Sequence, residues 1–199
     1  MTASNADKND APLPELLVFH KPASVTVTSS DEKGRRTVYD LLPGWVREEG
    51  YIPAGRLDRD TRGLLLFLKD GRLMDRLTRP GAVIKGYMAY VRGRVSAKQL
   101  SQVTGGVKAG KDILKAVSAE VRGYAGPAVK LFVRLDEGKN RHIRRMFGAL
   151  KDEKTGKPLK VTDLKRTAFG PLTLDIPSGS HRFLTREETL SLLQAVKER

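Results

Sequence analysis

The chain has 199 residues, 39% of them hydrophobic, and its 37 Lys and Arg outnumber its 23 Asp and Glu to give a formal net charge of +14. It has no cysteine, which excludes disulfides, thiolate metal sites and cysteine nucleophiles and fits a reducing compartment. No apolar run is long enough to span a bilayer, and the polar start MTASNADKNDAPLP lacks the apolar segment of a secretory signal. We therefore expect a cytoplasmic protein whose basic charge favours nucleic acid, rather than a membrane, as partner.

Hydrophobic patterning divides the chain into a short tail and one domain. Residues 1–14 are polar with two prolines near their end, so we expect a disordered tail before a single domain over 15–199, with two lobes around one cleft. In the first third of the chain the patterns predict strands at 16–20 and 25–29, helical turns at 37–42, and a strand at 64–68 that is buried on both faces. The middle of the chain is predicted to form a short helix at 71–81, a strand at 84–95, a helix at 96–106 and paired strands at 113–122 and 128–135. The last third is predicted to form a helix at 140–151, strands at 159–170 and 171–176, and a helix at 185–199.

Capping residues support three of these helices. Ser96 with Gln99, and Thr185 with Glu188, have the spacing of a capping box, and Asn140 is a candidate N-cap for the helix at 140–151. Strands outnumber helices, and the helices are scattered between hairpins. The sequence therefore predicts an α+β fold, a mostly antiparallel mixed sheet with flanking helices and a central basic cleft.

Four cations crowd the start of the helix at 140–151. Lys139, Arg141, Arg144 and Arg145 could form a phosphate site there, because a helix N-terminus and basic side chains both attract anions. Arg144 follows the apolar Ile143, so its side chain could instead lean inward, where it would need an acidic partner.

The segment GRLDRDTRGLLLF at 55–67 places two aspartates just before a buried strand. Asp58 could be a carboxylate held charged in a cleft by an arginine, and so act as a nucleophile or base. Alternatively, Asp58 and Asp60 are turn residues that cap their own backbone. The three histidines have no metal-ligand spacing, and the glycines form no phosphate loop, so we expect no metal and no nucleotide cofactor.

Four motifs in order resemble the RsuA-type family of bacterial rRNA pseudouridine synthases. They are AGRLDRDTRGLLLFLKDG at 54–71, KGY at 85–87, EGKNRHIRRMF at 137–147 and LKRTAFGPLTL at 164–174. The resemblance extends over about 16–193, and four motifs in family order are far more specific than any one alone. It implies the pseudouridine synthase fold and the isomerisation of uridine in RNA, without metal or cofactor.

The resemblance also implies roles for individual residues. Asp58 matches the catalytic aspartate, and Arg56 matches an arginine that enters the RNA as the target nucleotide leaves its stack. Tyr87 matches a tyrosine that packs on the uracil and can take the C5 proton, while Arg144 matches the arginine that pairs with the aspartate. Ile143 matches an apolar residue near the base, and Lys139 and Arg141 are expected to bind RNA phosphates.

Two departures refine the expectation. His142 stands where the family has glutamine, and only about fifteen residues precede the first strand, which leaves no room for an S4 RNA-binding domain. The latter suggests the short, RluE-like form, which acts on 23S large-subunit rRNA, as free rRNA or an assembly intermediate, and we expect a monomer. The alternative is a non-catalytic rRNA-binding or ribosome-assembly protein, which explains the charge equally well but not an acid in a cationic segment.

Overall fold

The structure is a computed structural model that describes residues 13–197. Its strands are β1 (Leu17–Lys21), β2 (Ile52–Pro53), β3 (Arg62–Leu68), β4 (Lys85–Arg92), β5 (Val107–Ala109), β6 (Asp112–Leu114), β7 (Ser118–Ala125), β8 (Ala128–Leu135), β9 (Lys160–Phe169), β10 (Leu172–Thr173) and β11 (His181–Phe183). Its helices are the 3-10 helix η1 (Val38–Leu41), α1 (Gly44–Glu48), α2 (Gly71–Thr78), α3 (Ala97–Gly105), α4 (His142–Gly148) and α5 (Arg186–Lys197). None of the described helices is long and apolar enough to cross a membrane.

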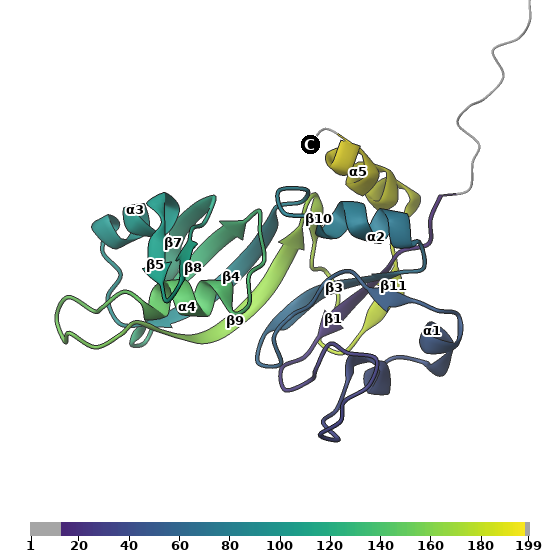
Figure 1. Cartoon of the computed structure of the whole chain (residues 1–199), viewed down its shortest axis with the longest axis horizontal. Helices are drawn as coiled ribbons and strands as arrows, with labels where there is room; N and C mark the ends of the chain where they lie inside the picture. The colour runs from purple at the N-terminus through teal and green to yellow at the C-terminus, as the bar shows by residue number, and fades with distance from the viewer. Residues whose placement is uncertain (1–12, 198–199) are drawn as a thin grey trace, which may run out of the picture.

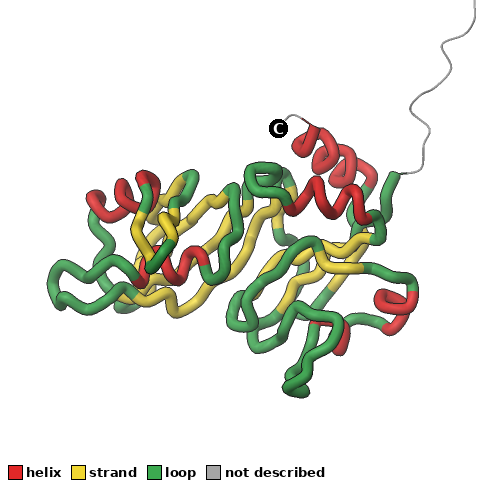
Figure 2. Tube along the Cα trace, in the orientation of Figure 1, coloured by secondary structure: helices red, strands yellow, loops and turns green. Residues whose placement is uncertain are grey.

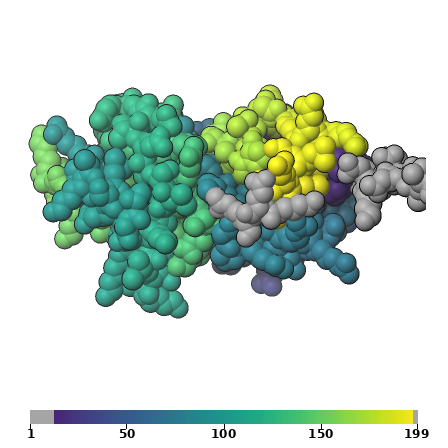
Figure 3. All heavy atoms as spheres, turned by 90° about the horizontal axis from the view of Figure 1, so that it is seen from above, coloured from purple at the N-terminus to yellow at the C-terminus, as the bar shows by residue number. Residues whose placement is uncertain are grey.

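One nine-stranded sheet runs through the molecule in the order β11-β1-β3-β9-β4-β8-β7, with β10 on β9 and β2 on β3. All its pairs are antiparallel except β3 with β9. Figure 1 shows two halves: a β1–β3 half with α1, α2 and α5, and a β4–β8 half with α3 and α4. The two halves lie side by side in Figure 3, and the long β9 joins them.

The β1–β3 half is built on strands that are buried on both faces. Every side chain from Leu64 to Leu68 is fully buried, as the continuous apolar run predicts. Alternate residues of β1 and β3 pack into two separate cores: one lies beneath α2 and α5, and the other contains residues of η1 and α1. Helices therefore flank the strands on this half (Figure 2).

The only parallel pairing in the described sheet is a short junction between the halves. Here Arg62 pairs with Lys165 and Gly63 with Arg166. Gly63 has φ +117, and a Cβ atom on it would lie 2.2 Å from the Arg166 carbonyl oxygen. The backbones can approach this closely only because residue 63 is glycine.

The predicted elements are mostly found, with several corrections. Residues 25–29 form one isolated bridge, Thr26 to Thr37, and not a strand; the alternation arises because Val25 and Val27 pack into the core. The predicted strand at 113–122 is divided between β6 and β7, and the strand predicted at 171–176 shrinks to β10. The short elements α1, β2, β5 and β11 have no counterpart among the predicted ones.

The predicted caps have a mixed outcome. Both capping boxes are confirmed: Gln99 N–H donates to Ser96 Oγ at 3.3 Å, and Glu188 N–H donates to Thr185 Oγ1 at 3.2 Å. Asn140 is wrong as an N-cap, because α4 begins after Arg141, which adopts a left-handed conformation with φ 48. Most of the tail predicted at 1–14 lies outside the described residues.

Candidate active site

Asp58 lies in the loop that connects β2 to β3. Thr61 N–H donates to the Asp58 carbonyl at 3.0 Å, which closes a turn around the aspartate. Lys21, which is fully buried, stabilises this loop. Its ammonium donates hydrogen bonds to the carbonyl oxygens of Thr61 at 2.7 Å and Arg59 at 3.3 Å. Lys21 was not among the residues predicted from the sequence; the available signal was a lysine directly after the short apolar strand whose predicted end is His20.

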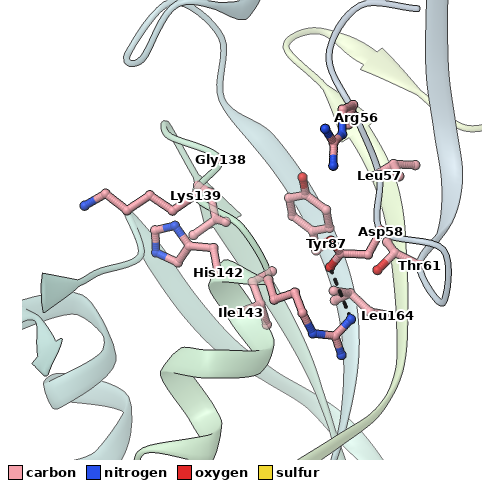
Figure 4. Close-up of a pocket in the computed structure, with 12 residues that line it drawn as sticks. Arg56, Leu57, Asp58, Thr61, Tyr87, Gly138, Lys139, His142, Ile143 and Leu164 are labelled. Atoms are coloured by element: carbon pink, nitrogen blue, oxygen red, sulfur yellow. Dashed lines mark ion pairs between the residues drawn. The ribbon is translucent and has the colours of Figure 1, made fainter. Parts of the chain in front are cut away.

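Tyr87 and Ile143 approach Asp58 from the other half of the molecule. Tyr87 lies on the buried face of β4, and Ile143 lies in the first turn of α4. Together with Asp58 they line one pocket (Figure 4), whose full lining is Arg56, Leu57, Asp58, Thr61, Tyr87, Leu135, Gly138, Lys139, Arg141, His142, Ile143 and Leu164. The fold thus brings together six of the seven predicted site residues; Arg144 is the exception.

Arg141 is the arginine beside Asp58. Its Nη1 lies 3.9 Å from Asp58 Oδ2, the ion pair drawn as a dashed line in Figure 4. The same guanidinium makes two hydrogen bonds, of 3.0 and 3.2 Å, to the carboxylate of Asp60. Carboxylates of the protein thus engage part of this guanidinium, whose side chain is 45% exposed, and the contact of Arg141 with an RNA phosphate stays a prediction.

Arg144 pairs with Asp60 and not with Asp58, which corrects the predicted ion pair. Its Nε lies 3.3 Å from Asp60 Oδ2, and its Nη2 donates to the Asp60 carbonyl at 3.0 Å. Its Nη1 donates to Val161 O of β9 at 2.9 Å. These contacts hold the backbone two residues after Asp58.

Asp60 is therefore more than a turn residue. Burial raises the pKa of its carboxyl, but the hydrogen bond from Arg141 and the charges of Arg144 and Arg141 outweigh this, so the pKa lies below its usual value. The carboxylate stays charged and holds two arginines next to the loop of Asp58.

The other basic residues predicted to contact phosphate differ in whether they already have an acidic partner in the protein. Arg145 donates to Asp112 Oδ2 at 2.6 Å, and Lys139 lies 3.3 Å from Glu137 Oε1. Arg56 is exposed and has no ion-pair partner among residues 13–197. In Figure 4 it stands at the end of the pocket toward which the Tyr87 hydroxyl points.

His142, which replaces the expected glutamine, is buried beside the pocket. Its Nε2 lies 3.1 Å from the carbonyl oxygen of Lys115. Burial lowers the pKa of His142, opposed by Glu137, so the ring is neutral at physiological pH. Within residues 13–197, no cluster of three or more metal-binding side chains occurs.

Comparison with solved structures first defines the class. A crystal structure of a pseudouridylate synthase has a TM-score of 0.73 and 26% identity, over 89% of this chain and 73% of that one. The expected fold, a mostly antiparallel mixed sheet with flanking helices, is thereby confirmed as the pseudouridine synthase fold.

Sequence comparison then gives the family. The model for RNA pseudouridylate synthase matches residues 15–149. The chain is 32% identical over 187 residues to ribosomal large subunit pseudouridine synthase B of Vibrio vulnificus, and 34% over 182 residues to that of Pseudomonas aeruginosa. The aligned parts cover 92% and 87% of this chain but 56% and 44% of those proteins. The chain belongs to the RNA pseudouridylate synthase family.

Proposed function

We propose that this protein isomerises uridine to pseudouridine in large-subunit rRNA, with Asp58 as the catalytic carboxylate. The observation that supports this most directly is the meeting of Asp58 and Tyr87, from different halves, in one pocket beside Arg141. Relatives that are 32% and 34% identical to this chain over the aligned parts carry the name of ribosomal large subunit pseudouridine synthases. The net charge of +14 supports an RNA partner.

The isomerisation suits these side chains. The bond from the ribose C1′ to N1 of the uracil breaks, the base turns, and C1′ bonds to C5; the C5 proton leaves and N1 gains one. Asp58 either attacks C1′ or removes the 2′ proton to give a glycal, and both routes remain open. Neither route needs an oxidant or a reductant.

Tyr87 supplies the face on which the uracil packs and the phenol that takes the C5 proton. It is only 8% exposed, so its ring is fixed, and its hydroxyl makes no hydrogen bond within the described part of the chain. Ile143 adds an apolar wall. The uridine has to leave its stack to reach them, which costs a few kcal/mol, and contacts of exposed cations such as Arg56 with phosphate offset that cost.

Within the family, we propose that the protein is most similar in activity to the RluE-like enzymes. We also propose that the protein acts as a monomer, on free rRNA or on an assembly intermediate.

Tritium release from RNA that carries 5-tritiated uridine tests the proposal. Asp58→Asn keeps the shape of the side chain, so we expect it to abolish release while RNA binding persists. The matched control is Asp175→Asn, since Asp175 is half-exposed and pairs with Arg182, which keeps Glu188 as a second partner. Normal release by the Asp58 variant would refute the role of Asp58. RNA binding by the intact protein without any release would favour the non-catalytic alternative.

A further inference from the structure

A second pocket adjoins the one that holds Asp58. The two share Arg56, Tyr87, Gly138 and Lys139 in their linings and therefore lie next to each other. The second pocket is lined further by residues that include Lys85, Glu137, Arg166 and Phe169. Two of these, Lys85 and Arg166, are buried cations to which the proposed chemistry gives no task.

Lys85 is 8% and Arg166 3% exposed. Arg166 Nε donates to the Leu64 carbonyl at 2.7 Å, but its Nη2 is buried and has no hydrogen-bond partner. Lys85 Nζ and Arg166 Cζ lie 5.7 and 5.4 Å from the centre of the same Phe169 ring. Within residues 13–197, no carboxylate lies at ion-pairing distance from either cation.

Two neighbouring buried cations without an anion are unfavourable, because both have lost water and they repel each other. The pKa of Lys85 reflects this: burial and the charge of Arg166 together lower it to about 8, and Asp136 only partly opposes them. Glu137, the carboxylate that lines this pocket, is directed to Lys139 at 3.3 Å and His142 at 3.9 Å. Glu137 therefore does not neutralise Lys85 or Arg166.

The sheet places this anion site next to Tyr87. Lys85 and Tyr87 are two residues apart on one face of β4, about 7 Å along the strand, and Tyr87 pairs across the sheet with Arg166. A uracil on Tyr87 is attached through its ribose to a phosphate on either side. A guanidinium with a free Nη2 and an ammonium are suited to the oxygens of such a group.

We propose that Lys85 and Arg166 bind the backbone phosphate adjoining the uridine that occupies the pocket of Asp58 and Tyr87. The inference rests on the proposed function, because it takes the occupant of that pocket to be a nucleotide in an RNA chain. Lys85 and Arg166 contact the phosphate and not the base, so the site does not select a base. It holds the sugar–phosphate backbone after the nucleotide has left its stack.

The test measures how the affinity for a single-stranded 12-mer of uridylate depends on salt. Each phosphate contact in a single strand contributes about 0.7 to the slope of log K against log salt concentration. We expect Lys85→Met, which keeps the aliphatic stem, to flatten the slope by about 0.7, and Lys85→Arg to restore it. Lys69→Met is the matched control, because Lys69 lies at the far end of β3 and pairs with Glu49; its slope should equal that of the wild type.

The proposal would be overturned if Lys85→Met has the melting temperature of the wild type and also its salt slope. It would equally be overturned if Lys69→Met flattens the salt slope as much as Lys85→Met does. If Lys85→Met does not fold, the wild-type protein provides the test through the NMR titration of its 13C-dimethylated lysines. The pKa of Lys85 should rise by about one unit or more when the 12-mer binds, and an unchanged pKa overturns the proposal. Tritium release by the wild type separates the two ideas: release without a response of Lys85 refutes the phosphate site alone, and a response without release refutes the isomerase alone.

Discussion

Replacing Arg144 by alanine should destabilise the protein strongly. The Arg144 side chain is 11% exposed and donates at 2.9 Å to Val161 O and at 3.0 Å to Asp60 O. Charged hydrogen bonds contribute about 1.5–3 kcal/mol each, and the ion pair with the half-exposed Asp60 carboxylate adds at most about 1 kcal/mol. Because solvent near Asp60 weakens these contacts, we expect the free energy of unfolding of Arg144→Ala, measured with denaturant, to be about 3 kcal/mol lower than that of the wild type.

The same substitution should reduce kcat beyond what the lost stability explains. Arg144 holds the carbonyl of Asp60, two residues after Asp58, and a displacement of about 1 Å at a reacting group can cost roughly 100-fold in rate. The control is Arg145→Ala on the same helix. Arg145 also donates to a carbonyl, Ala109 O at 2.7 Å, and to a carboxylate, Asp112 at 2.6 Å, but these lie at the β5–β6 hairpin.

Tritium-release kinetics, measured below the melting temperature of both variants, separate an effect on kcat from the loss of stability. We expect kcat to fall about 100-fold in Arg144→Ala with a smaller change in KM, and to stay within a few-fold of wild type in Arg145→Ala. Asp60→Asn combined with Arg144→Ala should be less than additive, because both substitutions remove the same ion pair between Arg144 and the Asp60 carboxylate. Equal kcat losses in the two arginine variants would refute the positioning role of Arg144.

Three further predictions concern the junction, the second pocket and the tyrosine. Gly63→Ala should lower the free energy of unfolding by several kcal/mol, because its Cβ would lie 2.2 Å from backbone; Gly34→Ala, with φ +64 and open space around it, should cost only about 1 kcal/mol. The pKa of Lys85 is lowered from 10.5 to about 8 on folding, so the unfolded chain binds more protons between these values. Wild-type stability in denaturant should therefore rise by about 2 kcal/mol more than that of Lys85→Met from pH 8 to pH 10, and parallel pH profiles contradict this. Tyr87→Phe should lower kcat with little change in KM, whereas Tyr87→Ala should also raise KM; an active Phe variant would exclude the phenol as the proton acceptor.

Residues with one strong local determinant could be placed from the sequence. A run of five apolar side chains can be buried only between two layers, which predicted the central strand of the β1–β3 half. The capping boxes depend on two residues three apart, and both formed. By contrast, β11 has only three residues, and its position depends on pairing with Leu17–Phe19, more than 160 residues earlier, which no local pattern reveals.

The charge pairing in the cleft could not be predicted for a related reason. The sequence predicted a pair between Asp58 and Arg144 and only a turn role for Asp60, whereas Asp58 lies beside Arg141 and Asp60 pairs with both arginines. The choice depends on the left-handed conformation of Arg141, which starts α4 one residue later than predicted, and on the Val161 carbonyl that engages Arg144. Both are properties of the assembled backbone.

The junction between β3 and β9 links the two pockets. Asp58 lies four residues before β3, and Gly63 of β3 packs against the backbone of Arg166, the residue whose guanidinium lines the second pocket. The same Arg166, a residue of β9, donates back to the Leu64 carbonyl of β3 at 2.7 Å and pairs with Tyr87 of β4. One close backbone contact thus sets the distance between the carboxylate, the tyrosine and the proposed phosphate site. A strain introduced at Gly63 should therefore impair catalysis and weaken oligouridylate binding together, whereas a substitution of Lys85 should affect mainly binding.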